Sequence, residues 1–231
     1  LTSGNTTDDT ALVLSGTNES GSSVKVYNGS TELGAATVSG TSWSYSATVA
    51  NGTTYQFNVK ETDLAGNTSN ATTNFVVTGD TTPPTVSSVV IASAAGIQND
   101  FLNADDNVSV TATFSESVIV DNASGTPTLT LVVGSDNRTS TYTSGSGSSP
   151  LVFQYTIQAG ETDADGISIE ANTLALNSGT IRDAAGNNAT ITYSSVSANT
   201  SYKVDNTAPS VDNFTLSDTA LKAGDNATVT L

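Results

Sequence analysis

A short acidic motif occurs twice in the chain and, with the proline junction that follows each copy, divides the sequence into repeats. Asp63-Leu-Ala-Gly-Asn67 recurs as Asp183-Ala-Ala-Gly-Asn187. Each copy precedes a stretch rich in β-forming residues and then a junction, Asp80-Thr-Thr-Pro-Pro84 or Asp205-Asn-Thr-Ala-Pro209. Internal similarity of this kind indicates an array of related units rather than one large domain.

The repeats predict three units. We expect residues 1–82 to form a module that lacks its first strand, residues 83–206 to form a complete and larger module, and residues 207–231 to form the first strands of a third. The third unit is indicated because Ala223-Gly-Asp225 and the residues after it echo Ala104-Asp-Asp106 and the strand after it. A chain of 231 residues is also longer than one ordinary sandwich domain and suits two.

Short runs in which apolar and polar residues alternate predict β-strands. Gly, Asn, Ser and Asp separate these runs and favour turns, while helix-forming runs are nearly absent. The sequence therefore predicts an all-β fold of tandem immunoglobulin-like antiparallel β-sandwich modules, arranged end to end. We expect Trp43 to be a core residue and residues 145–149 to be a flexible loop tip. The predicted strands lie at residues 24–26, 43–47, 55–59, 108–114 and 153–157.

The composition excludes several classes of function. The chain has 22 acidic and 6 basic residues, and its net charge of −16 would repel nucleic acid and anionic membranes. Cysteine, histidine and methionine are absent, which excludes disulfides, thiolate or imidazole metal ligands, and Cys/His or Ser/His catalysis. No run approaches the ~20 apolar residues of a membrane span, and Leu1 does not begin a signal peptide. We expect a soluble internal fragment of a longer protein, and not an enzyme.

Oxygen-bearing side chains are predicted to converge where the first two units meet. In a sandwich of immunoglobulin type, alternate loops gather at each end of the module. This topology brings together Asp80, Glu116, Asp183 and Asn187. Two carboxylates 4 Å apart repel each other by about 4 kcal/mol at an effective dielectric constant near 20, unless a cation lies between them. Ca²⁺ binds about 6–8 oxygen ligands with loose geometry, so the sequence predicts a calcium site.

A second candidate site lies at the opposite end of the middle unit. There the topology joins the loop of Asp105 and Asp106 to the loop that contains Asp163 and Asp165. Asp9 occupies the first of these positions in the first unit, opposite a loop without a carboxylate. The alternative for each residue is an ordinary solvated turn, because Asp and Asn cap turns through their own backbone.

The sequence resembles a known family in both of its larger units. The resemblance is to the bacterial immunoglobulin-like extender repeats of large, type I-secreted, calcium-binding RTX-type surface adhesins. It implies that Asp80, Glu116, Asp183 and Asp205 take part in calcium sites between modules. It also implies an incomplete site at Glu19 and Asp63, for which no preceding linker aspartate is visible. The motifs that carry the likeness are Thr7-Asp-Asp9, Trp43-Ser-Tyr45, Asp63-Leu-Ala-Gly-Asn67, Phe114-Ser-Glu116-Ser-Val118, Thr162-Asp-Ala-Asp165-Gly166 and Asp183-Ala-Ala-Gly-Asn187.

Two functions follow as expectations. The first is a structural extender on the bacterial cell surface, secreted, monomeric and stiffened by Ca²⁺, that supports cell adhesion and biofilm formation. Its partners would be the neighbouring modules of the same chain, with a surface glycan or protein ligand bound elsewhere in the full-length protein. The second is a module, centred on residues 83–206, that itself binds a glycan or peptide, with residues 144–150 as the contact.

Overall fold

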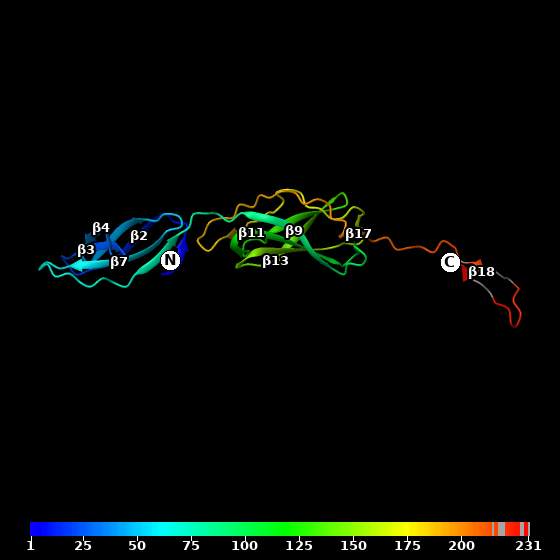
Figure 1. The fold of residues 1–231 in the computed structure, drawn as a ribbon, viewed down its shortest axis with the longest axis horizontal. Helices are drawn as coiled ribbons and strands as arrows, with labels where there is room; N and C mark the ends of the chain where they lie inside the picture. The colour runs from blue at the N-terminus through cyan, green and yellow to red at the C-terminus, as the bar shows by residue number, and fades with distance from the viewer. Residues whose placement is uncertain (214, 217–219, 227–228, 231) are drawn as a thin grey trace.

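Every regular element is a β-strand in the part of the chain that the computed structural model describes, residues 1–213, 215–216, 220–226 and 229–230. The all-β prediction is confirmed. Figure 1 shows two larger groups of strands, one formed by residues 5–79 and the other by residues 86–205. Within the described residues, no helix is long and apolar enough to cross a membrane.

The first group is a β-sandwich of two sheets. Alternating apolar residues turn inward from both sheets and form a small core of buried Ala47, Phe57 and Val77, against which Leu12 and Leu14 pack. One sheet has the order β1-β8-β7-β3-β4 and the other β2-β6-β5. The strands are β1 (Asn5–Thr7), β2 (Ala11–Thr17), β3 (Ser23–Asn28), β4 (Thr31–Ala35), β5 (Thr37–Ser39), β6 (Ser42–Thr48), β7 (Thr54–Thr62) and β8 (Phe75–Gly79).

A short strand precedes β2 in the first group, where the sequence suggested none. β1 pairs in parallel with β8, from Asn5 opposite Val77 to Thr7 opposite Gly79. Its sequence, Asn-Thr-Thr, carries no apolar alternation by which it could have been recognised. Because β1 joins β8 and not β2, β2 stays at the edge of its own sheet.

Trp43 lies outside the buried core of the first group, contrary to the expectation. It is half-buried and stands opposite Gly16 in the β2–β6 pair. A Cβ atom at Gly16 would lie 2.8 Å from the Trp43 Nε1 atom, so the indole ring covers the glycine. The missing side chain at Gly16 lets the ring lie flat on the strand instead of pointing between the sheets.

The second group has one large sheet and one small sheet. The large sheet has the order β12-β13-β14-β11-β16, and β9 pairs with the other side of β11. The small sheet has the order β10-β17-β15. The strands are β9 (Val86–Ala95), β10 (Phe101–Leu102), β11 (Asn107–Asp121), β12 (Thr128–Val133), β13 (Asp136–Ser144), β14 (Ser148–Thr156), β15 (Thr162–Asp163), β16 (Thr180–Arg182) and β17 (Lys203–Asp205).

The core of the second group is covered largely by irregular chain rather than by a second full sheet. Leu131 and Phe153 of the large sheet are fully buried, as are Leu102 of the small sheet and Ile167 in the loop after β15. Isolated bridges hold the covering segments in place, for example Val132 to Ser168 and Ile169 to Val196. Residues 166–200 contain many Asn, Ser, Thr and Gly residues, and this composition favours extended chain with turns over long strands.

The stretch expected to be a flexible loop tip is a tight turn between β13 and β14. The Ser148 N–H donates to the Gly145 carbonyl oxygen at 3.0 Å. The Gly147 N–H donates to the Val118 carbonyl oxygen at 2.8 Å, and the Ser146 hydroxyl accepts from the Val120 N–H at 2.9 Å. These bonds attach the turn to β11, so the expectation of flexibility is wrong.

The predicted third unit lies only partly within the described residues. There β18 (Thr215–Leu216) and β19 (Val229–Thr230) form an antiparallel pair. The predicted strand around residues 225–230 includes residues 227–228, which are outside the described part of the chain.

Candidate metal centre

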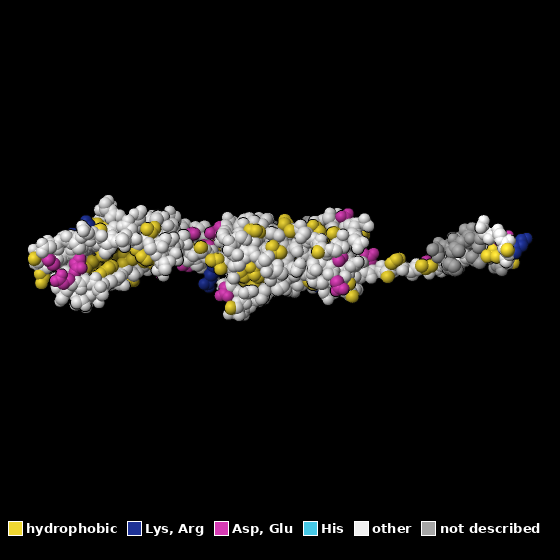
Figure 2. All heavy atoms as spheres, turned by 90° about the horizontal axis from the view of Figure 1, so that it is seen from below, with side chains coloured by type: hydrophobic (Ala, Val, Ile, Leu, Met, Phe, Trp, Pro, Cys, Tyr) yellow, Lys and Arg dark blue, Asp and Glu magenta, His cyan; other side chains and the backbone are white. Residues whose placement is uncertain are grey.

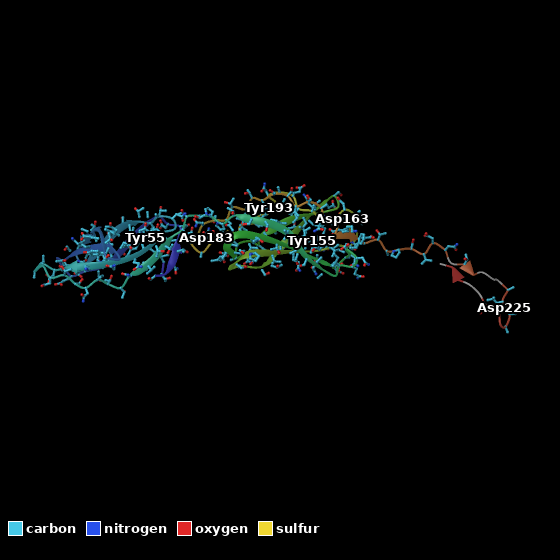
Figure 3. All side chains as sticks on the ribbon, in the orientation of Figure 1. Tyr55, Tyr155, Asp163, Asp183, Tyr193 and Asp225 are labelled. Atoms are coloured by element: carbon cyan, nitrogen blue, oxygen red, sulfur yellow. The ribbon has the colours of Figure 1, made fainter. Side chains whose placement is uncertain are left out.

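Three carboxylates from distant parts of the sequence meet where the two groups of strands are joined. Asp80 follows β8, Glu116 lies within β11, and Asp183 follows β16. Each offers a carboxylate oxygen, and the three atoms lie within 4.8 Å of one another. Figure 3 shows Asp183 at the end of the second group that faces the first. We call these three residues the junction cluster. It contains three of the four residues that the sequence predicted to converge.

The backbone around Asp183 explains its fixed position. Asp183 is 4% exposed. Its Oδ1 atom accepts hydrogen bonds from the backbone N–H groups of Ala185 at 2.9 Å, Gly186 at 2.7 Å and Asn187 at 2.9 Å. The motif therefore folds around its own first carboxylate, in the manner of an Asx turn.

Asp80 is held by both groups of strands. Its N–H donates to the Thr7 carbonyl oxygen at 2.8 Å, and its own carbonyl oxygen accepts from the Asn187 side-chain amide at 2.9 Å. Its Oδ1 atom accepts from the Thr82 N–H at 3.0 Å. A direct backbone bond also crosses the junction, from the Asp8 N–H to the Ala185 carbonyl oxygen at 3.2 Å.

Glu116 comes from an irregular part of β11. The pairing of β11 with β14 shifts in register between Thr113 and Val118. Next to Glu116, the Ser115 N–H donates to the Thr85 carbonyl oxygen at 2.8 Å, and the Ser115 hydroxyl accepts from the Thr85 N–H at 3.0 Å. An irregularity in a strand re-aims the side chains within it, and here Glu116 reaches the junction.

The electrostatics of the junction cluster favour a bound cation. Burial raises the pKa of the Glu116 carboxyl, and the nearby charges of Asp183 and Asp80 raise it further. Within the described residues, the ion pairs are formed by Lys25 and Arg138, and neither pairs with this cluster. Three hard oxygen ligands without a basic partner suit Ca²⁺ by donor chemistry.

Asn187 has a different part from the predicted one. The sequence suggested that it supplies an oxygen ligand. In the structure its amide nitrogen faces the junction cluster and donates to the Asp183 Oδ2 atom at 2.7 Å and to the Asp80 carbonyl oxygen. Asn187 therefore positions the other two residues and does not offer its oxygen to a cation.

The candidate site at the opposite end is not assembled in the same way. Asp163 lies at that end in Figure 3 and is 3% exposed. Its two oxygens accept from the Gly134 N–H and the Gly166 N–H, both at 2.8 Å. Asp106 accepts from the Asn103 N–H at 2.8 Å. The junction cluster is the one group of three carboxylates this close among the described residues, so Asp105, Asp106, Asp163 and Asp165 do not form another.

The remaining predicted ligands cap local turns. Asp205 accepts from the Thr207 N–H at 2.8 Å, just as Asp80 accepts from the Thr82 N–H. Asp9 accepts from the Ala11 N–H at 3.2 Å. These contacts agree with the solvated-turn alternative and leave a metal role for Asp205 and Asp9 as a prediction.

Glu61 is a residue that sequence reasoning missed in the first group. Its Oε1 atom accepts from the Glu19 N–H and from the Ser22 hydroxyl. The Ser22 hydroxyl, followed by the Glu19 N–H, holds the pKa of the Glu61 carboxyl below its usual range. The cross-strand neighbours of β7 would have been needed to find this contact, and alternation alone does not give them.

A second missed feature is a buried charged network in the second group. Glu161 accepts from the Arg138 Nε–H group, from the Tyr155 hydroxyl at 2.6 Å and from the Gln158 N–H at 2.8 Å. Burial and the bond to Glu161 raise the pKa of the Tyr155 hydroxyl. With an anion, a cation and their donors all paired, this network is structural.

The fold and the junction together define a class of protein: an all-β chain with an immunoglobulin-like sandwich joined through an acidic junction to a larger β unit. Residues 1–81 match the family model of the bacterial Ig-like domain. This match supports the interpretation of the first unit as a bacterial Ig-like repeat.

Comparison with solved structures finds only distant similarity. Fibronectin(III)-like modules of Clostridium thermocellum CbhA are 15% identical with a TM-score of 0.37, over 83% of this chain and 88% of theirs. The Bacteroides ovatus mixed-linkage glucan utilization locus protein SGBP-B, in complex with a mixed-linkage heptasaccharide, is 15% identical with a TM-score of 0.25, over 87% of this chain and 42% of that one. No curated protein sequence matches the chain.

Proposed function

We propose that the chain is a structural extender segment of a secreted bacterial surface adhesin, built from modules arranged end to end and stiffened by Ca²⁺ at their junctions. The observation that carries this proposal is the convergence of Asp80, Glu116 and Asp183 within 4.8 Å at the junction. The proposal includes a monomeric chain whose partners are neighbouring modules, with cell adhesion and biofilm formation as the biological role. It assigns the chain no catalytic role.

Hydrogen bonding of the linker supports a stiff junction even before a cation is considered. The Thr81 N–H and the Thr82 hydroxyl both bond to the Asn51 side chain of the first group, at 2.9 Å each. On the other side, the Thr190 N–H donates to the Pro84 carbonyl oxygen at 2.8 Å. The residues between the two groups are therefore attached to both of them.

The distribution of charge supports a site at module ends. Figure 2 shows acidic side chains gathered mainly at the ends of the two groups of strands on the face that it displays, with uncharged side chains between them. A bound Ca²⁺ would supply positive charge that offsets the repulsion within the junction cluster. The cluster would stay ionised, and the fold would be stabilised in proportion to ln(1 + [Ca²⁺]/Kd).

The adhesin setting and secretion rest on the bacterial Ig-like match of residues 1–81 and on the resemblance of the sequence motifs. The alternative function, ligand binding through residues 144–150, gains no support at that place because the turn is bonded to β11.

Calcium titration of the whole chain tests the proposal. We expect Ca²⁺ to raise the melting temperature and to narrow the distribution of interatomic distances in small-angle scattering, and a chelator to reverse both changes. Glu116→Gln removes one ligand charge and should abolish both responses. Glu170→Gln is the matched control, since Glu170 is exposed and outside the cluster. A chain that responds equally to Ca²⁺ with and without Glu116 would exclude the junction cluster as the site.

A further inference from the structure

β9 has an outer edge that is almost unpaired. Its ten residues pair with β11 on one side. On the other side, within the described residues, the Val86 N–H donates to the Thr190 carbonyl oxygen at 3.3 Å, and no further bond of β9 is formed there. Residues 86–99 contain no charged residue and no proline, which are the usual protections of an edge strand. This edge therefore presents free N–H and C=O groups.

A second extended segment faces this edge. Residues 191–195 run without a turn or bend between a parallel bridge of Thr190 to Thr85 and an antiparallel bridge of Val196 to Ile169. Thr192, Ser194 and Ser195 are exposed, and they make no hydrogen bond within the part of the chain that the structure describes. The segment thus offers unpaired backbone groups opposite those of β9.

Tyr193 anchors the second segment. Its hydroxyl lies 2.7 Å from the Thr173 hydroxyl, and its N–H donates to the Asn172 side chain at 2.8 Å. Its ring packs against the core. Figure 3 shows Tyr193 on the long side of the second group, away from the end that carries Asp183. The two segments meet near Thr190 and then separate, with Tyr193 fixing the far wall.

A groove of about 590 Å³ lies between the two segments. It is lined by uncharged residues alone, and from Ala184 to Tyr202 the chain has no charged side chain. We call it the β9 groove. The residues that line it are Val86, Ser87, Ser88, Val89, Asn172, Thr192, Tyr193, Ser194, Ser195 and Val196.

We propose that the β9 groove binds an extended, uncharged peptide strand, which adds to the free edge of β9. An extended backbone carries alternating donors and acceptors, and it is the partner that unpaired strand edges accept in β-augmentation. Neutral walls complement neutral side chains, whereas the net charge of −16 repels acidic segments. This site does not depend on the spacer function or on calcium.

A neutral sugar fits the groove less well than a peptide. Sugar binding commonly uses an exposed aromatic face, but the Tyr193 ring is packed and its hydroxyl is already bonded to Thr173. The unpaired backbone on both walls favours a ligand that itself has a peptide backbone.

The test uses the whole chain and a fluorescein-labelled peptide of six alternating Thr and Val residues. We expect saturable binding by fluorescence polarisation, and slower amide hydrogen exchange at residues 86–89 and 192–195. The same peptide with alternate amides N-methylated keeps its side chains but loses donors, and should bind at least about tenfold more weakly. Absence of saturable binding, equal binding of the methylated peptide, or protection elsewhere would overturn the proposal.

Two proline variants locate the site. Ser194→Pro removes an unpaired N–H inside the groove, and should weaken peptide binding at least about fivefold. Ser197→Pro makes the same change at an exposed residue just beyond the groove and should leave binding unchanged. Competition by a neutral dextran oligosaccharide, or a dimer in sedimentation that protects the same amides, would identify a sugar or a second copy as the occupant and overturn the proposal.

Discussion

The side-chain amide of Asn187 donates a hydrogen bond to the backbone carbonyl oxygen of Asp80, 2.9 Å away, and so joins residues 107 positions apart in the sequence. The same amide nitrogen donates to the Asp183 carboxylate at 2.7 Å. The first copy of the motif has the second bond alone, between Asn67 and Asp63 at 2.9 Å. The two copies therefore separate the local role of the motif from its role at the junction.

Replacement of Asn187 by alanine should loosen the linker. Both amide bonds are lost, and a hydrogen bond to a charged group contributes about 1.5–3 kcal/mol, so we expect the free energy of unfolding of the second unit to fall by about that amount. Amide hydrogen exchange at residues 80–85 should accelerate in the same variant. Asn67→Ala is the control, because it loses the bond to Asp63 but touches no linker. Equal exchange at residues 80–85 in the two variants would show that the bond to Asp80 does not restrain the linker.

Glu116 should make the metal-free protein more stable in acid. Burial, with the charges of Asp183 and Asp80, raises the pKa of the Glu116 carboxyl, so the folded state binds its proton more tightly than the unfolded state. Its contribution to stability is then fully present below the unfolded pKa of about 4.3 and is lost as pH rises through the folded value. Chemical unfolding in chelator across this pH range should show the contribution, and Glu116→Gln should lack it.

Glu61 should contribute with the opposite sign. Hydrogen bonds from Ser22 and Glu19 lower the pKa of its carboxyl, so its contribution is present above the unfolded pKa and is lost as pH falls through the folded value. Glu61→Gln should therefore remove a loss of stability in acid from the first unit, measured by the same unfolding series. If the two glutamine variants changed the pH profile in the same direction, the assignment of one of these environments would be wrong.

Sequence alternation predicted the strands and the topology predicted the convergence of Asp80, Glu116 and Asp183, but neither could predict how individual side chains are oriented. The 108–114 prediction falls within β11 because every second residue there is apolar and buried. Asn187 presents nitrogen rather than oxygen, and Asp163 turns inward to two glycine N–H groups. Such choices depend on which backbone donors lie nearby in three dimensions, which periodicity does not encode.

Tyr155 should stabilise the second unit through Glu161. The Glu161 side chain is 5% exposed, and the Tyr155 hydroxyl donates to it at 2.6 Å. Tyr155→Phe leaves the buried carboxylate with one donor fewer, so we expect the free energy of unfolding to fall by about 1.5–3 kcal/mol. Tyr202→Phe is the control, since the Tyr202 hydroxyl makes no hydrogen bond within the described residues, and should change stability by less than about 0.5 kcal/mol. Similar losses in the two variants, measured by urea unfolding, would mean that the hydroxyl of Tyr155 is not what holds Glu161.

The matched glycines of the repeated motif offer a separate test of the contact between the two groups of strands. Gly66 and Gly186 have φ values of +90° and +115°, so alanine at either position should cost about 1–2 kcal/mol in backbone strain. A Cβ atom at Gly66 would meet no atom within 4 Å, whereas at Gly186 it would lie 3.2 Å from both carboxylate oxygens of Asp8.

Gly186→Ala should therefore displace Asp8, whose N–H bonds to the neighbouring Ala185 carbonyl oxygen across the junction. We expect faster hydrogen exchange at Asp8 and a broader distance distribution in small-angle scattering for Gly186→Ala, and neither change for Gly66→Ala. Both variants share the strained backbone, so a difference between them reports the junction alone. If the two alanine variants scattered identically and exchanged Asp8 at the same rate, the contact of Asp8 with the Gly186 turn would have no part in holding the two groups of strands together.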